Sequence, residues 1–128
     1  MLSRFPLGVL AAALLPPTLV ACEPNEVSTC GTLPSEAWET ISTVEEGGLY
    51  LYAEDDTHFG NYEAVLPDEE PGYYREYTVD TPGLNHRGAR RIVTGGGADG
   101  IVDEWYYTAD HYESFCEVNP PGKPSEAP

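Results

Sequence analysis

The sequence GYYREYTVDTPGLNHRGARR, residues 72–91, predicts two strands joined by a turn. Tyr73–Val79 is rich in aromatic and β-branched residues, which favour strands. Asp80–Gly83 ends in Thr-Pro-Gly and is typical of a turn. Arg87–Thr94 is the next strand region. Because side chains alternate along a strand, Glu76 lies on the same face of the first strand as Tyr74 and Thr78.

The same stretch holds most of the positive charge of the chain. The protein has six Lys and Arg residues against 22 Asp and Glu residues, and four of the six lie here. An acidic protein that gathers arginines in one place is expected to hold an anion there. Along the second strand, Arg87 and Arg91 should point to one side and Arg90 to the other. Arg75 lies on the face of the first strand that Glu76 does not share.

The rest of the chain predicts an α+β domain. Ser35–Glu46 is the one convincing helix, with Ser35 as its cap and a Gly pair as its stop. Trp38 falls on its apolar face and is interpreted as a core anchor. Residues 95–100 are Gly-rich and predict a flexible loop. Residues 105–118 predict a closing hairpin, so one helix precedes several antiparallel strands.

The N-terminus is expected to be a targeting segment, residues 1–22. Arg4 supplies its positive charge, and the following apolar run is too short and too rich in proline to span a membrane. Leu19–Cys22 resembles the lipobox of bacterial lipoproteins, which predicts lipidation of Cys22; simple secretion and a retained anchor are the alternatives. Residues 23–29 are then a tether, residues 30–118 the domain and residues 119–128 a Pro-rich tail. Each alternative puts the mature protein outside the cytoplasm.

The three cysteines fit export. If Cys22 carries lipid, Cys30 and Cys116 remain as one pair in an oxidising compartment. Their disulfide would close a loop of roughly 85 residues and stabilise the fold by about 4–5 kcal/mol. The alternative is that Cys116 is a buried free thiol.

The net charge restricts the class of ligand. Without Arg4, five basic and 22 acidic residues remain, a formal charge of −17. Such a domain repels nucleic acid at long range, and its non-specific binding to phosphate backbones should be weak. A polyanionic substrate is therefore expected only in a local cationic cleft. His58, His86 and His111 show no metal-ligand spacing, so we expect neither a metal nor another cofactor.

Three polar features could carry chemistry: Glu76, the pair Arg87 and Arg91, and His111. Each also has an ordinary structural explanation, as a salt-bridged strand residue, as charge neutralisation or as a surface histidine. Together they form a set that suits transesterification at a phosphodiester. A carboxylate base, a histidine acid and two guanidiniums can perform it without a metal.

Four separated segments closely resemble the guanine-specific microbial ribonucleases, the family of barnase and ribonuclease Sa. They are residues 59–67, 72–79, 87–92 and 106–112, in the same order. The resemblance implies an endoribonuclease with one helix packed on a twisted antiparallel sheet of about five strands. It implies that single-stranded RNA is cut 3′ to guanosine through a 2′,3′-cyclic phosphate, which is then hydrolysed.

The resemblance also implies a role for each site residue. Glu76 matches the general base and His111 the general acid, while Arg87 and Arg91 match the arginines that neutralise the phosphate. Tyr112 matches a tyrosine that contacts the phosphate. For guanine, the resemblance implies that the Glu63 carboxylate accepts hydrogen bonds from N1–H and N2–H₂. It implies that main-chain N–H groups of Gly60, Asn61 and Tyr62 donate to O6 and that the Phe59 ring packs against the base plane.

The chain departs from the family at several positions. Gly60 and Tyr62 replace a Gln and an Arg of the family loop, which removes a positive charge and predicts a looser loop. His86 is also unlike its counterpart in ribonuclease Sa, and residues 94–105 are expected to form a longer loop than in that relative. Cys116 falls earlier than the family's C-terminal cysteine, so the predicted disulfide needs a different geometry.

Other functions remain in view at the sequence level. A non-catalytic surface lipoprotein that kept the fold is one, although all four catalytic residue types are present. Another is a ribonuclease toxin used against neighbouring cells. An exported ribonuclease endangers its producer, so a barstar-like protein inhibitor is an expected partner. We expect a monomer that meets the membrane only through a lipid on Cys22.

Overall fold

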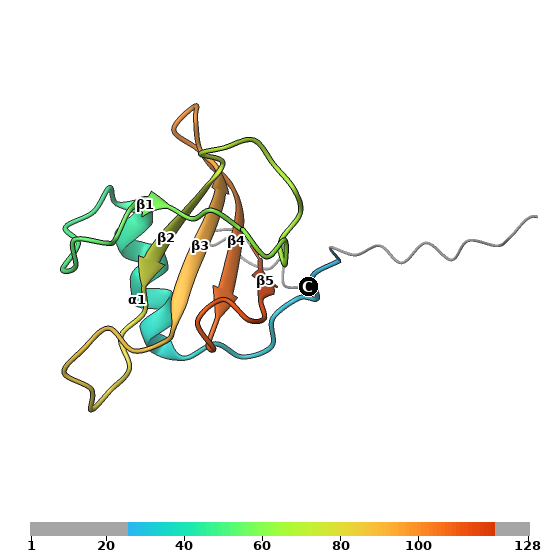
Figure 1. Cartoon of the computed structure of the whole chain (residues 1–128). Coiled ribbons are helices and arrows are strands. Elements are labelled where there is room, and N and C mark those ends of the chain that lie inside the picture. Colours follow the sequence, from blue (N-terminus) through green and yellow to red (C-terminus); the bar gives the residue numbers. More distant parts are fainter. Residues whose placement is uncertain (1–25, 120–128) are drawn as a thin grey trace, which may run out of the picture.

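The two strands predicted at residues 73–79 and 87–94 pair with each other in the middle of the sheet (Figure 1). The structure is a computed structural model, and it describes residues 26–119. Within these residues, one helix precedes a five-stranded antiparallel sheet in the order β1-β2-β3-β4-β5. This confirms the predicted α+β class. The elements are α1 (Ser35–Glu45), β1 (Thr57–His58), β2 (Tyr74–Thr78), β3 (Arg91–Gly96), β4 (Val102–Thr108) and β5 (Cys116–Val118).

Strand direction brings two distant loops to the same end of the sheet. β2 and β4 both run antiparallel to β3, so they run parallel to one another. The loops that follow them, residues 79–90 and 109–115, therefore leave the sheet at the same end, as Figure 1 shows. The first of these loops contains Arg87 and the second contains His111. Sheet topology thus joins two parts of the predicted site.

Helix α1 packs on one face of the sheet through few residues. Ala37 and Ile41 are fully buried, whereas Trp38 is 43% exposed. The prediction of Trp38 as a core anchor was wrong, because it borders the apolar face without pointing into the sheet. The predicted cap was also wrong: the N-cap is Pro34, and no side chain caps the helix. The C-terminus is as predicted, since Gly47 and Gly48 follow it with positive φ angles.

The two sheet faces bury two separate clusters. On the helix side, nine buried residues form the larger cluster. They come from α1, from four strands, from the segment before α1 and from the residue after β2: Leu33, Ala37, Ile41, Tyr77, Val79, Ile92, Trp105, Tyr107 and Val118. On the other side, a smaller cluster consists of Leu66, Tyr74, Val93 and Tyr106, with Phe59, Tyr112 and Phe115 packed against it. Neighbouring residues such as Ile92 and Val93 enter different clusters, as the period of a strand requires.

The predicted disulfide between Cys30 and Cys116 is present, which confirms that pairing. The segment before α1 lies beside β5: Cys30 N–H donates to the Glu117 carbonyl at 2.8 Å, and Glu117 N–H donates to the Ser28 carbonyl at 2.8 Å. The bridge therefore joins two backbones that are already hydrogen-bonded. It ties the start of the domain to its last strand across a sequence separation of 86.

The loop predicted at residues 94–105 is shorter than expected. Gly95 and Gly96 continue β3, and Val102 begins β4, which leaves a tight connection at residues 97–101. The glycines are needed by the sheet itself. A Cβ at Gly95 would lie 2.6 Å from the Glu104 carboxylate and 2.8 Å from the Tyr73 ring, so cross-strand side chains occupy that space.

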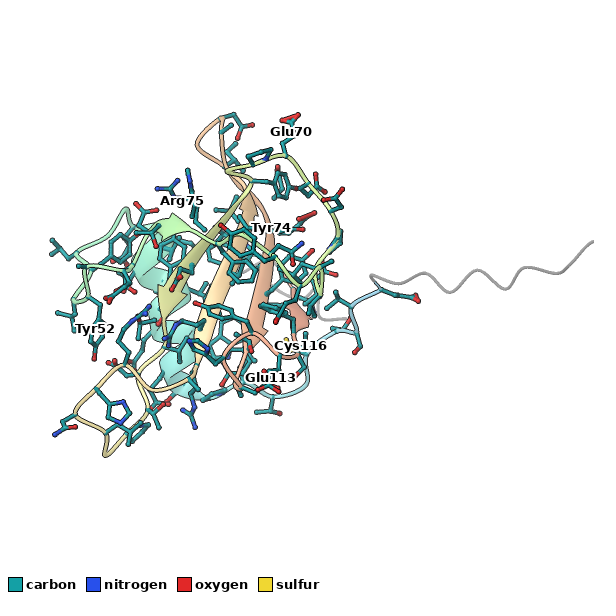
Figure 2. All side chains as sticks on the ribbon, viewed as in Figure 1. Tyr52, Glu70, Tyr74, Arg75, Glu113 and Cys116 are labelled. Carbon is teal, nitrogen blue, oxygen red and sulfur yellow. A yellow bond between two sulfur atoms is a disulfide. The ribbon has the colours of Figure 1, made fainter. Side chains whose placement is uncertain are left out.

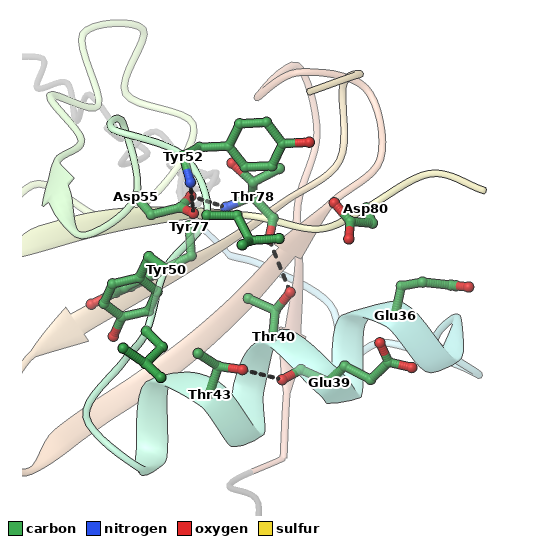
Figure 3. A pocket seen from close by; sticks show the side chains of 12 residues that line it. Glu36, Glu39, Thr40, Thr43, Tyr50, Tyr52, Asp55, Tyr77, Thr78 and Asp80 are labelled. Atoms are coloured by element: carbon green, nitrogen blue, oxygen red, sulfur yellow. Dashed lines mark hydrogen bonds between the residues drawn. The ribbon is translucent and has the colours of Figure 1, made fainter. Parts of the chain in front are cut away.

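The acidic segment Glu54-Asp55-Asp56 is hydrogen-bonded to the end of β2. Asp55 accepts hydrogen bonds from the backbone N–H groups of Thr78 (2.7 Å) and Tyr52 (3.3 Å). Figure 3 shows this network beside α1, where Thr40 also donates to the Thr78 carbonyl at 2.9 Å. The pocket there, about 200 Å³, is lined by four carboxylates: Glu36, Glu39, Asp55 and Asp80.

Several predictions lie outside the described residues. These are the targeting segment, lipidation of Cys22, residues 23–25 of the tether and all but the first residue of the tail at 119–128. Along residues 26–119, no helix has the length and apolar character needed to cross a membrane.

Candidate active site

Glu76 and two arginines meet on the face of the sheet opposite α1. Arg87 donates from Nη2 to Glu76 Oε1 at 2.9 Å. The Nε of Arg91 lies 3.6 Å from the same oxygen. The Glu76 side chain is 17% exposed, so one carboxylate edge faces two guanidiniums while the group stays accessible from outside. The structure thus brings together three of the four residues predicted to be catalytic.

Arg91 is held rigidly. Its side chain is 2% exposed, and its Nη1 donates to the carbonyls of Gly88 (3.1 Å) and Arg90 (2.7 Å). Its Nε donates to the Tyr112 hydroxyl at 3.2 Å, and its guanidinium lies 5.9 Å from the centroid of the Tyr112 ring. A buried guanidinium with this many acceptors keeps one orientation.

Arg87 is placed by side chains that the sequence did not single out. Its Nε donates to Thr78 Oγ1 at 2.9 Å and lies 3.8 Å from a Glu54 carboxylate oxygen. Its guanidinium lies 5.9 Å from the centre of the Tyr52 ring. Thr78 shares the strand face of Glu76, and that alternation is a signal that could have revealed its role.

Arg87 reaches Glu76 for a different reason than predicted. The alternation argument assumed that Arg87 belongs to the second strand, but β3 begins at Arg91. Arg87 lies in the loop between the strands, and the path of that loop brings it to the same side as Arg91. Arg90 does point to the other face, where its Nη1 lies 3.9 Å from Glu36 of α1. Arg75 pairs at 2.7 Å with Asp56 at the edge of the sheet.

His111 lies in the turn between β4 and β5, next to Tyr112. The His111 ring is exposed, with its centroid 4.8 Å from that of the Tyr112 ring. Its backbone N–H donates to the Ala89 carbonyl at 3.0 Å, so the turn is joined directly to the arginine loop. Burial foremost, then the Glu76 carboxylate, raises the pKa of Tyr112, which keeps its hydroxyl protonated as a donor.

An open cleft of about 770 Å³ connects these groups with the segment predicted to bind guanine. Glu113, labelled in Figure 2, lies on the loop between β4 and β5 and lines this cleft. Seven of the lining residues were predicted site residues, whereas His58, Val65 and Glu113 were not. The seven are Phe59, Gly60, Tyr62, Glu63, Glu76, His111 and Tyr112.

The wall formed by residues 59–66 has a fixed backbone. Phe59 stacks on Tyr112 with ring centroids 4.6 Å apart and packs edge-on against Phe115. The Asn61 side chain turns inward, donating to the Leu66 carbonyl at 2.9 Å and accepting from the Leu66 N–H at 3.0 Å. Asn61 therefore stabilises this wall with its side chain, and it is not among the residues that line the cleft.

The tip of this wall is exposed and carries the departures from the family. Tyr62 is 96% exposed, and its ring lies over Gly60, where a Cβ would collide with it. Within the described residues, the backbone N–H groups of Gly60, Asn61 and Tyr62 have no protein acceptor. Glu63 follows them and is exposed. The tip thus presents main-chain donors beside a carboxylate.

The cleft and the pocket beside α1 differ in charge. The cleft lining holds His58 and His111 together with Glu63, Glu76 and Glu113, and the guanidiniums of Arg87 and Arg91 lie against Glu76. The pocket in Figure 3 has four carboxylates and no cationic side chain among its lining residues, so of these two a polyanion is favoured in the cleft. Among residues 26–119, no group of three or more His, Cys, Asp or Glu side chains is arranged to hold a metal ion.

Fold and site together define an α+β protein with a carboxylate, an imidazole and two guanidiniums around an open cleft. These groups can move protons and stabilise charge at a phosphodiester. A family model described as ribonuclease matches residues 16–119. The chain belongs to the ribonuclease family, and the predicted family and enzyme class are confirmed.

Curated and solved relatives agree with this assignment. The chain is 54% identical over 83 residues to guanyl-specific ribonuclease St of Saccharopolyspora erythraea, covering 65% of this chain and 77% of that protein. It is 47% identical over 87 residues to guanyl-specific ribonuclease Sa of Kitasatospora aureofaciens, covering 68% and 86%. Ribonuclease Sa2, solved in complexes with mononucleotides, superposes with a TM-score of 0.68 at 41% identity, covering 74% of this chain and 96% of that one.

Proposed function

We propose that this ribonuclease is a guanine-specific endoribonuclease acting on single-stranded RNA. The observation that carries the proposal is the single cleft that joins Glu76, His111 and the guanine-binding wall. The similar ribonucleases St and Sa are guanyl-specific, and a solved relative, ribonuclease Sa2, holds guanosine-2′-cyclophosphate. Specificity and chemistry would then act on adjacent parts of one nucleotide.

The first step is transesterification. Glu76 takes the proton of the ribose 2′-hydroxyl, whose oxygen attacks the adjacent phosphorus. The bond from phosphorus to the 5′-oxygen breaks, and His111 gives that oxygen its proton. Arg87 and Arg91, with the Tyr112 hydroxyl, stabilise the negative charge that develops on the phosphate oxygens. The products are a 2′,3′-cyclic phosphate and a free 5′-hydroxyl.

The second step hydrolyses the cyclic phosphate with the proton-transfer roles exchanged. His111 takes a proton from water, whose oxygen attacks the phosphorus, and the bond from phosphorus to the 2′-oxygen breaks. Glu76 gives that oxygen a proton, which leaves a 3′-phosphate. DNA lacks the 2′-hydroxyl and cannot react in this way. The guanidiniums supply the positive charge, so the scheme requires no metal ion.

Guanine is selected by residues 59–63, which are part of the wall. Glu63 accepts from guanine N1–H and N2–H₂, and the free main-chain N–H groups at 60–62 donate to O6. Phe59 supplies the ring on which the base lies. Adenine would leave these polar groups unpaired, which can be worth several kcal/mol of discrimination.

The test is cleavage of GpN and ApN dinucleotides by the purified domain. We expect strong preference for GpN and no cleavage when the guanosine is 2′-deoxy. Glu76→Gln and His111→Ala should each lower kcat by about 10²–10⁴-fold. Glu104→Gln is a matched control, because Glu104 is a partly buried strand carboxylate that accepts a hydrogen bond from Tyr73 at 3.1 Å. Equal cleavage of both dinucleotides would overturn the specificity, and undiminished turnover in both variants would overturn the assigned roles.

We also propose that the mature protein acts outside the cytoplasm as a monomer, anchored through a lipid on Cys22. Export is supported by the leader pattern and by the Cys30–Cys116 disulfide, which oxidising compartments favour. Mass spectrometry of the mature N-terminus is the test, and an unmodified terminus or a cut elsewhere would contradict the anchor. A barstar-like inhibitor made by the producing cell is the expected partner.

A further inference from the structure

The turn that carries His111 has an unusual backbone. His111 and Tyr112 have φ angles of 58° and 75°, so two consecutive residues with side chains lie in the left-handed region. Such residues disfavour this region, because the Cβ approaches the following carbonyl oxygen. A conformation of this kind persists only where surrounding contacts hold it.

Hydrogen bonds to the Asp110 carboxylate stabilise much of this backbone conformation. Its Oδ1 accepts from the Thr108 hydroxyl at 2.8 Å and from the Ser114 N–H at 2.9 Å, while its Oδ2 accepts from the Ser114 hydroxyl at 2.6 Å. The carboxylate therefore joins the last residue of β4 to a residue beyond the strained pair. It links the two ends of the turn that contains His111 and Tyr112, and we call this set of hydrogen bonds the brace.

Thr108 completes the brace. It is 1% exposed, and its hydroxyl oxygen accepts from the Tyr112 N–H at 3.1 Å and from the Asp110 N–H at 3.3 Å. With the hydroxyl proton directed to Asp110, the oxygen is left free to accept these two bonds. His111 N–H is bound separately to the Ala89 carbonyl in the arginine loop. Each backbone N–H of the strained pair thus has a fixed acceptor.

We propose that Asp110, acting through Thr108, is a positioning residue for catalysis. It does not line the cleft, but it sets the backbone from which the His111 imidazole and the Tyr112 hydroxyl reach the phosphate. This inference rests on the proposed function, because it assigns Asp110 a part in the same reaction. A small displacement of an acid from its proton acceptor lowers the chemical step far more than substrate binding.

The first experiment compares two substitutions of Asp110. Asp110→Ala removes all three accepted bonds, and we expect kcat for GpN to fall about 10–100-fold with KM changed less than threefold. Asp110→Asn keeps an oxygen that can accept from Thr108 and Ser114, so it should retain kcat within about threefold. Asp99→Ala is the matched control, because Asp99 is an exposed turn aspartate that accepts from the Ile101 N–H at 3.0 Å in another hairpin. It should leave both constants unchanged.

The second experiment separates positioning from folding. In the His111→Ala background, Asp110→Ala should lower kcat much less than it does in the unmodified protein, because the acid is gone and only the Tyr112 hydroxyl remains to be positioned. Thermal unfolding of each variant shows whether it is folded at the assay temperature.

Three outcomes are distinguishable. A full additional loss in the double variant, or unchanged kcat in Asp110→Ala, would overturn the positioning role while leaving the proposed function intact. Failure of the unmodified protein to cleave GpN would instead overturn the proposed function. If Asp110→Ala does not fold, Asp110→Asn and Thr108→Val decide the matter: kcat retained in the first and lowered in the second supports the role, and any other pattern refutes it.

Discussion

The two faces of the sheet contain residues of the same strands but do different work. On the helix face, Tyr77 and Ile92 belong to a closed apolar cluster with α1. On the cleft face, their neighbours Glu76 and Arg91 belong to an arrangement of charges. The cleft face still has an apolar base, because Val93 and Tyr106 belong to a buried cluster against which Phe59, Tyr112 and Phe115 pack.

This comparison separates the residues that stabilise the fold from the residues that face the cleft. The helix face joins the disulfide, the helix and four strands, so changes there should lower the free energy of unfolding and leave turnover unchanged. The cleft face holds its charges on loops that the sheet brings to one end, so changes there should alter kinetics more than stability. Each prediction below tests that separation.

The largest expected effect is loss of the disulfide. Replacing Cys30 and Cys116 with Ser removes a crosslink over a sequence separation of 86, which should lower the free energy of unfolding by about 4–5 kcal/mol. Denaturant unfolding measures it. At temperatures where the variant is folded, kcat for GpN should be unchanged. A lowered kcat in the folded variant would mean that the helix face also controls the cleft.

The next effect is on α1. Ile41 is 1% exposed in the larger cluster, so Ile41→Ala should destabilise the protein by about 2–5 kcal/mol. Trp38→Ala, three residues earlier, is the control: Trp38 is 43% exposed and should cost about 1 kcal/mol or less. Thermal unfolding of both variants decides. A larger loss from Trp38 would restore the sequence interpretation of that residue as the core anchor.

On the cleft face, Phe59→Leu should act mainly on binding. It removes the stack with Tyr112 and a base platform, so we expect about 1 kcal/mol less stability and a KM for GpN raised about tenfold. Phe115→Leu is the control, since Phe115 belongs to the same aromatic cluster but does not line the cleft. Steady-state kinetics of both variants is the measurement, and an equal rise in KM would contradict the role of Phe59.

The smallest effect depends on pH. The hydrogen bond from the Ser114 hydroxyl is the main cause that lowers the pKa of Asp110. Because the folded-state pKa lies below the unfolded value of about 3.9, this carboxylate stabilises the fold above that pH. The contribution disappears as pH falls through the folded-state pKa. The stability difference between wild type and Asp110→Asn should therefore shrink from pH 7 toward about pH 2, as urea unfolding would show. A constant difference would mean that the charge contributes nothing.

Much of the fold could be predicted because local sequence patterns indicate the helix and the main strands. The helix at 35–45 and the strand at 74–78 follow from periodicity and from the residues at their ends. Thr57–His58 was missed because two exposed residues make no pattern, and they form β1 by pairing with β2. Gly95 and Gly96 were assigned to a loop because glycine is rare in strands, yet the cross-strand neighbours require it there.

For the site, the sequence by itself determined which residue types are present, where the arginines cluster and which residues of β2 share a face with Glu76. Strand alternation is local, so a linear pattern contains it. Only the tertiary structure decided that Arg87 reaches Glu76 from a loop, that Trp38 stays exposed and that Asp110 braces the turn at His111. Those outcomes depend on contacts between loops that are far apart in the sequence, and a linear pattern does not contain such contacts.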